Sequence, residues 1–209
     1  MTRMQAPTRP VLPGLVLLVF MLAAGLISPF ANAAKSDSEK TLAAFEAFTS
    51  APSKITQQAL MQYFSQQATH PITERTPEFE QMVLEGHPLA LEVAFECMGY
   101  TDGAESLHLR WLIGQSIMSN PEGFLKAVTK YRHTIQRLGA LVGYLGPDYV
   151  DNLSASILGL EERYMALRDI DSPEYSEARD EVLLALSKRI YQRREQMQEI
   201  SSDSELRHD

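Results

Sequence analysis

The chain has 209 residues, 44% of them hydrophobic, and its 27 acidic side chains outnumber its 19 lysines and arginines. This size and balance suit one ordinary globular domain and exclude a disordered polyelectrolyte or a low-complexity polymer. The net charge of −8 argues against a nucleic-acid binder, and the single cysteine excludes an intramolecular disulfide.

The first predicted element is a secretory signal peptide at residues 1–33. Two arginines precede an apolar stretch from Val11 to Ile27, and Ala31-Asn32-Ala33 supplies the small side chains that signal peptidase requires. The alternative is an uncleaved N-terminal anchor in the inner membrane, because the apolar stretch approaches the shortest helix that spans a bilayer. The favoured interpretation is export, which gives a periplasmic or secreted protein after cleavage behind Ala33.

Charge is unevenly distributed along the remaining chain. Removal of residues 1–33 leaves 17 basic against 27 acidic side chains, a net charge of −10. Residues 34–105 carry −7, residues 106–147 carry +4 and residues 148–209 carry −7. The middle of this acidic protein is therefore basic.

Beyond the signal, apolar residues recur every three or four positions, which is the spacing of one helix face. Prolines, glycines and polar clusters separate the helical segments. The predicted helices cover residues 38–49, 54–68, 77–84, 88–98, 104–118, 121–145, 150–167 and 173–200. Segment 88–98 is apolar on nearly every side, so we expect it at the centre of the core with Cys97 buried.

Three of the predicted helices begin with the same chemistry. Thr76-Pro77-Glu78, Asn120-Pro121-Glu122 and Ser172-Pro173-Glu174 each offer a side-chain acceptor, then a proline at the first helical position, then a carboxylate in the first turn. Their separations of 44 and 52 residues overlap the period of about 40–47 residues found in paired-helix repeats. The residues between them do not repeat, so a short helical-repeat solenoid is the minority alternative.

No stretch of residues 34–209 alternates with period two, as a half-buried strand does. The sequence therefore predicts an all-α fold, an irregular multi-helix bundle in a single helical domain at residues 34–200. A short linker joins the last two helices and indicates a C-terminal αα-hairpin. Residues 201–209 are polar and are expected to form a flexible tail.

The predicted helix 121–145 carries a basic ridge. Lys126, Lys130, His133 and Arg137 follow the helical spacing on the side opposite its apolar residues. The ordinary interpretation is a solvated face whose charges pair with acidic neighbours. The functional alternative is a surface that binds an acidic partner protein or, less favoured, lipid phosphate at a membrane.

The turn after this helix combines aromatic and acidic side chains. Tyr144, Asp148 and Tyr149 surround Gly146-Pro147, and tyrosines on a rigid turn can anchor a protein interface. In the alternative, Asp148 caps the next helix while the tyrosines pack at the end of the bundle. We include all three in the predicted partner-binding set, beside the basic ridge.

One group resembles a set of metal ligands. Glu105 and His108 lie three residues apart, and Glu92 and Glu96 lie four apart on the preceding helix. Di-iron bundles use Glu-x-x-His on two helices, and this chain has the motif once. The favoured interpretation is structural: Glu105 suits the positive end of its helix, Glu92 and Glu96 border solvent, and His108 is a surface or hydrogen-bonded core residue. We therefore expect no metal, no cofactor and no catalytic residue.

Together these features favour a non-enzymatic exported protein that binds another protein, such as an inhibitor, an immunity protein or an adaptor. The export signal, the helical pattern and the segregated charge, which suits electrostatic steering of a partner, all point in this direction. The alternative is a helical-bundle enzyme, or a metal or small-molecule binder, built from Glu92, Glu96, Glu105 and His108.

Overall fold

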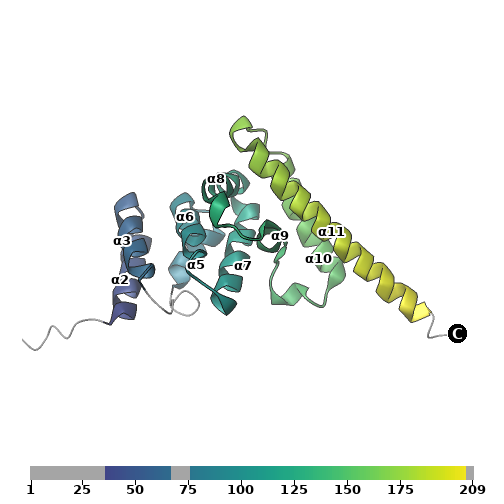
Figure 1. Cartoon of the computed structure of the whole chain (residues 1–209), viewed down its shortest axis with the longest axis horizontal. Coiled ribbons are helices and arrows are strands. Elements are labelled where there is room, and N and C mark those ends of the chain that lie inside the picture. The colour runs from purple at the N-terminus through teal and green to yellow at the C-terminus, as the bar shows by residue number, and fades with distance from the viewer. Residues whose placement is uncertain (1–35, 67–75, 206–209) are drawn as a thin grey trace, which may run out of the picture. The chain divides into compact units, whose positions relative to one another are not determined.

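The computed structural model of the chain describes residues 36–66 and 76–205, and every regular element in these ranges is helical (Figure 1). The predicted all-α multi-helix bundle is thus confirmed, whereas the predicted signal peptide lies outside the described residues. The α-helices are α2 (Asp37–Ser50), α3 (Lys54–Phe64), α5 (Pro77–Leu84), α6 (Pro88–Cys97), α7 (Gly103–Ser119), α8 (Pro121–Tyr131), α9 (Leu138–Gly143), α10 (Leu153–Arg168) and α11 (Ser176–Glu205). Three 3-10 turns lie between them: η2 (Arg132–Thr134), η3 (Pro147–Tyr149) and η4 (Pro173–Tyr175).

The predicted proline-led starts are present, but only one of them has the expected cap. Asn120 Oδ1 accepts a hydrogen bond from Gly123 N at 2.8 Å at the start of α8. Thr76 and Ser172 make no side-chain cap bond, so that part of the prediction is wrong. Proline alone gives the helical backbone angle at these starts, since it fixes φ without needing a donor.

Consecutive helices pack as pairs, and each pair contacts the next. Helix α2 contacts α3, α5 contacts α6, and α7 contacts α8; along the chain α3, α6 and α8 form one row of contacts, and α2, α5 and α7 form another. Such contacts between neighbouring pairs also occur in helical-repeat proteins. The first row brings α3, α6 and α8 together, and a cluster of charged side chains lies where these three helices meet.

Helices α10 and α11 form the predicted C-terminal hairpin, and Figure 1 shows them side by side. Arg194 on α11 pairs with Glu161 on α10, which aligns the two helices. Helix α11 continues through Glu205, so the predicted start of a flexible tail at residue 201 falls inside the helix. Residues 206–209 lie outside the described part.

The core is continuous from α2 to α11, and α6 lies at its centre as predicted. Phe95 of α6 stacks on Tyr131 at a centroid distance of 5.9 Å and packs against Phe124 at 6.1 Å. Cys97 is fully buried, as expected, and its burial raises the pKa of the thiol. On α7, however, Leu107 and Met118 are exposed, because residues eleven apart return to the same helix face and that face points outward.

The predicted helix 121–145 is wrong as one continuous element. Helix α8 ends at Tyr131, η2 follows, and Ile135 adopts an extended backbone before α9 begins at Leu138. The Thr134 hydroxyl donates to Tyr131 O at 2.8 Å, and Arg132 Nη1 donates to Ile135 O. Such side-chain bonds to the backbone compete with helical bonds, which accounts for the break.

Candidate functional site

A charge cluster lies where α3, α6 and α8 meet. Glu92 Oε2 accepts hydrogen bonds from Lys54 Nζ at 2.5 Å and from Lys130 Nζ at 2.6 Å. One turn further along α6, Glu96 Oε1 accepts a hydrogen bond of 2.6 Å from the Tyr131 hydroxyl. Because each of the three helices contributes a partner, this cluster fixes their relative positions.

The cluster shifts the protonation of its members. Burial alone would raise the pKa of Glu92, but the hydrogen bonds from Lys130 and Lys54 outweigh it and lower the pKa to about 2. Burial, followed by the hydrogen bond to the Glu96 carboxylate, raises the pKa of Tyr131. Glu92 is thus a carboxylate at neutral pH, and Tyr131 is a hydrogen-bond donor.

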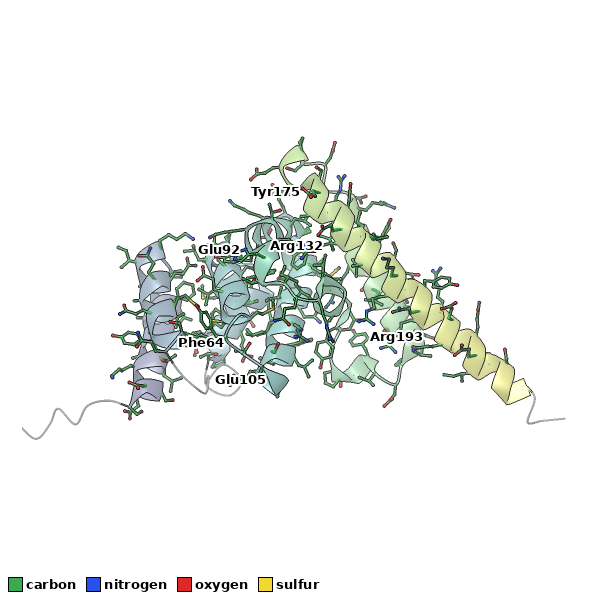
Figure 2. The ribbon with its side chains drawn as sticks, viewed as in Figure 1. Phe64, Glu92, Glu105, Arg132, Tyr175 and Arg193 are labelled. Carbon is green, nitrogen blue, oxygen red and sulfur yellow. The ribbon has the colours of Figure 1, made fainter. Side chains whose placement is uncertain are left out.

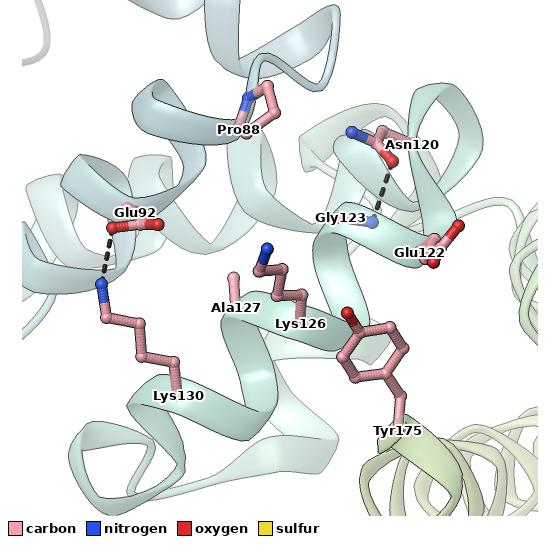
Figure 3. Close-up of a pocket in the computed structure, with 9 residues that line it drawn as sticks. All are labelled: Pro88, Glu92, Asn120, Glu122, Gly123, Lys126, Ala127, Lys130 and Tyr175. Atoms are coloured by element: carbon pink, nitrogen blue, oxygen red, sulfur yellow. Dashed lines mark hydrogen bonds and ion pairs between the residues drawn. The ribbon is translucent and has the colours of Figure 1, made fainter. Parts of the chain in front are cut away.

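A pocket of about 230 Å³ opens beside this cluster, between α6, α8 and η4 (Figure 3). The Lys126 side chain extends into it, and Figure 3 shows the Tyr175 hydroxyl on the other side of Lys126 from Glu92. Among the residues that the structure describes, Lys126 is in no ion pair. The pocket therefore combines the Lys126 ammonium group with the carboxylates of Glu92 and Glu122, and its lining has both signs of charge. Its lining comprises Pro88, Glu92, Asn120, Glu122, Gly123, Lys126, Ala127, Lys130 and Tyr175.

A tight turn leads into α6 and holds Asn120, which lines this pocket. Asn120 Nδ2 donates to Gly86 O at 2.7 Å, which joins the turn to the start of α8. Gly86 has a φ of +73°, and a Cβ there would lie 2.4 Å from Asn120 Cβ. Only glycine fits this position, since both the backbone angle and the close approach exclude a side chain.

The four residues of the predicted basic ridge do not share one helix face, because the chain breaks after Tyr131. Lys126 reaches the pocket and Lys130 pairs with Glu92. His133 is exposed in η2, and Arg137 precedes the first turn of α9. The apolar side of α8 is buried in the core. The ridge is therefore replaced by separate cations, two of them beside Glu92.

The predicted turn residues occupy different environments. Tyr144 ends α9 and is half-buried, Tyr149 is half-buried against the core, and Asp148 is exposed in η3. The alternative in which Asp148 caps the next helix is wrong, because Asn152 Oδ1 accepts the capping bond from Ala155 N at 3.0 Å. The role of the three residues in partner binding stays a prediction.

The predicted metal-like group does not assemble. Figure 2 shows Glu92 and Glu105 well apart. His108 Nε2 lies 3.1 Å from Glu80 Oε1, without the geometry of a hydrogen bond, and its ring packs near Trp111. Within residues 36–66 and 76–205, no group of three or more histidine, cysteine, aspartate or glutamate side chains could hold a metal ion.

The sequence analysis missed a buried cation. Arg163 of α10 is only 1% exposed, and its Nη1 donates to Val142 O at 2.7 Å and to Tyr144 O at 3.0 Å. Its Nη2 is buried without a hydrogen-bond partner, and burial lowers the pKa of the guanidinium to about 10. The available signal was its position: Arg163 lies three residues after Leu160 and four before Leu167, within the apolar spacing of the helix.

A second feature missed from the sequence is the end of the apolar face of α11. Val182 and Leu186 are fully buried on this face, whereas Met197 is 38% exposed and Ile200 is 63% exposed. Residues 11 and 14 positions after Leu186 return to nearly the same helix face. The cover of the apolar face therefore thins toward its end, where Met197 still contacts Ser154 of α10 and Ile200 is mostly exposed. The spacing of Met197 and Ile200 could have revealed this.

No protein-family model, curated protein or solved structure matches this chain. In the part of the chain that the structure describes, no helix combines the length and the apolar character needed to cross a membrane.

Proposed function

We propose that this chain is an exported helical protein that binds another protein through the far end of α11. The observation that supports the proposal most strongly is the exposure of Met197 and Ile200 on the face that is buried at Val182 and Leu186. Exposed apolar side chains that continue a buried face are typical of a surface that a partner covers. Tyr191 is also exposed nearby on α11 and could serve as an aromatic anchor.

The charges beside this apolar end are of both signs. Lys188, Arg189, Arg193 and Arg194 precede it, whereas Glu195 and Glu199 directly adjoin Met197 and Ile200. Arg194 pairs with Glu161, and Arg193 contacts only the Gln196 side chain among the described polar groups. A partner segment with apolar side chains flanked by residues of both charges would complement this surface.

Export is the other half of the proposal, and it depends on residues 1–33. The basic, apolar and small-residue regions of this segment support a cleaved signal peptide. Mass spectrometry of the protein purified from the periplasm or medium is expected to give a mature chain that begins at Ala34. A mass that includes residues 1–33 would favour the membrane-anchored alternative instead.

Site-specific photo-cross-linking tests the binding surface directly. A photoreactive amino acid at position 200 of the full chain is expected to give a discrete adduct with one partner on irradiation of intact cells. The matched control is position 55 on α3, since Ile55 is also an exposed isoleucine, 79% exposed, on a helix elsewhere in the fold. We expect no adduct of the same mass from position 55.

Introducing a negative charge at the same surface gives an independent result. Met197→Glu is expected to abolish the adduct from position 200, whereas Ile55→Glu leaves it intact. Both substitutions replace exposed side chains, so stability should change by no more than about 0.5 kcal/mol in either variant. Equal adducts from positions 55 and 200, or an adduct with twice the mass of the chain, would contradict binding to a different protein.

A further inference from the structure

A small polar cavity of about 120 Å³ lies between the end of α6, the start of α7 and the segment that joins α8 to α9. It is separate from the pocket beside Glu92, and the two share no lining residue. No acidic side chain lines the cavity. Its polar lining consists of Thr101, Ser106, Arg110, Thr134, Gln136 and Arg137.

The two arginines of this cavity lack counter-ions. Among the residues that the structure describes, neither Arg110 nor Arg137 forms an ion pair. By contrast, Arg132, only five residues before Arg137, pairs with Glu181 at 2.6 Å. Two guanidinium groups that line one small cavity repel each other unless an anion lies between them.

The cavity also contains an unused hydrogen-bonding group. The Thr101 hydroxyl is buried and has no hydrogen-bond partner. The Thr134 hydroxyl donates its proton to Tyr131 O, so it supplies no donor to the cavity. Buried polar groups in native proteins are almost always satisfied, so the Thr101 hydroxyl is available to bond an atom that enters the cavity.

We infer that this cavity binds a small oxyanion, a phosphate or sulfate group, between Arg110 and Arg137. Guanidinium groups present planar pairs of N–H donors that match the oxygens of such anions, and the Thr101 hydroxyl adds a third donor. The volume suits one tetrahedral group, either as a free ion or as the end of a larger molecule.

The break between α8 and α9 creates this site. In a continuous helix, Arg137 would lie on the same face as Lys126 and Lys130. The extended backbone at Ile135 and the non-helical backbone at Arg137 instead bring Arg137 to the cavity that Arg110 of α7 lines. The break between α8 and α9 thus places Arg137 where it can bind the anion.

Calorimetric titration with inorganic phosphate tests the inference. The mature protein is titrated at constant ionic strength, with chloride as the reference salt, and saturable binding is expected. Arg110→Ala and Arg137→Ala should each weaken binding about tenfold or more, because each removes charge-assisted hydrogen bonds. Arg168→Ala at the end of α10 is the control, because Arg168 is exposed, pairs with Asp169 and does not line the cavity; it should bind phosphate as the unmodified protein does.

Thr101→Val separates ligand binding from folding. This substitution removes the unpaired hydroxyl while keeping the shape, so the thermal midpoint without phosphate should be unchanged or higher. Its phosphate affinity should nevertheless fall several-fold, because a donor to the anion is lost. Circular dichroism of each variant confirms that a lost affinity does not come from unfolding.

A parallel titration with O-phosphoserine distinguishes the two sources of the anion. Tighter binding of O-phosphoserine assigns the cavity to a phosphate group on a larger molecule, and tighter binding of inorganic phosphate assigns it to the free ion. Either pattern supports the site. Absence of saturable binding of both probes at millimolar concentration, or equal affinities in the unmodified protein and both arginine variants, overturns the inference.

Discussion

Two charged groups of this protein are held in opposite ways. Arg163 is enclosed in the interior between α7, α9 and α10, where backbone carbonyls of Val142 and Tyr144 accept from one of its nitrogens. Glu92 lies at a half-buried junction of helices, where two ammonium groups surround it. The interior cation has no carboxylate partner in the described structure, whereas the carboxylate near the surface has two counter-ions.

The difference shows that the number of counter-ions does not measure how much a charge contributes to stability. The lysines that contact Glu92 are each at least half exposed, so water screens and competes with these ion pairs. Arg163 itself is only 1% exposed, and its loss would leave the buried carbonyl of Val142 and the part-buried carbonyl of Tyr144 without this donor. We therefore expect the interior group, with fewer charged partners, to be the more costly one to remove.

The largest expected effect is that of Arg163→Ala. This substitution leaves the carbonyls of Val142 and Tyr144 without their donor and opens a cavity behind Gly114. We expect a loss of about 3–5 kcal/mol in the free energy of unfolding, measured by urea denaturation.

Arg179→Ala is the control for this prediction. Arg179 also donates to a backbone carbonyl, Ile170 O at 2.7 Å, but it is part-exposed and pairs with Asp180. Its removal should cost about 1 kcal/mol, because water can replace the lost bond. Equal losses of unfolding free energy in Arg163→Ala and Arg179→Ala would contradict the expectation that the interior arginine contributes more to stability than the part-exposed one.

A smaller effect is expected from Gly114→Ala, which tests how firmly the guanidinium is held. A Cβ at Gly114 would lie 3.0 Å from both terminal nitrogens of Arg163. Alanine normally stabilises a helix by about 1 kcal/mol relative to glycine. Here the fixed guanidinium cannot move away, so we expect a net loss of about 1 kcal/mol in thermal or chemical denaturation.

Gly139→Ala on α9 provides the comparison for that variant. Its Cβ would also approach an arginine, but at 3.9 Å from Arg189 Nε, which is an ordinary contact. Arg189 is exposed and can adjust, so this substitution should be neutral or stabilising. A stabilised Gly114→Ala variant would mean that the Arg163 side chain is free to shift.

The fold class was predictable because helix faces follow from local spacing. The apolar spacing of segment 88–98 gave its central place in the core, and Pro77 and Pro121 marked the starts of α5 and α8. The break after Tyr131 was not predictable in the same way, since the residues up to Leu145 keep the helical period. Hydrogen bonds from the Thr134 and Arg132 side chains to backbone carbonyls compete with the helical bonds there. The spacing of apolar residues carries no information about such bonds.

The candidate sites were harder to predict because they join residues that are distant in the chain. The ordinary interpretation of the basic ridge, that its charges pair with acidic neighbours, holds for Lys130, but its partner Glu92 lies 38 positions earlier and spacing could not identify it. The Arg110 and Arg137 cavity depends on the backbone break itself. Spacing along one helix therefore indicated which residues are polar and exposed, but the packing of α6, α7 and α8 decided their partners.

A comparably small effect is expected from Glu92→Gln, which we predict to cost about 1 kcal/mol or less at neutral pH because its ion pairs are partly screened. The pKa of Glu92 is about 2 in the folded protein, against an ordinary value of 4.5. A lowered pKa means that the carboxylate stabilises the fold fully above about pH 4.5 and loses this contribution as the pH falls toward 2. The difference in unfolding free energy between the unmodified protein and Glu92→Gln should shrink over that range, whereas Glu46→Gln, at an exposed position of α2, should show no such change. A difference that stays constant from neutral pH down to pH 3 would mean that the two lysines do not stabilise the Glu92 carboxylate, and the contrast with Arg163 would become one of burial alone.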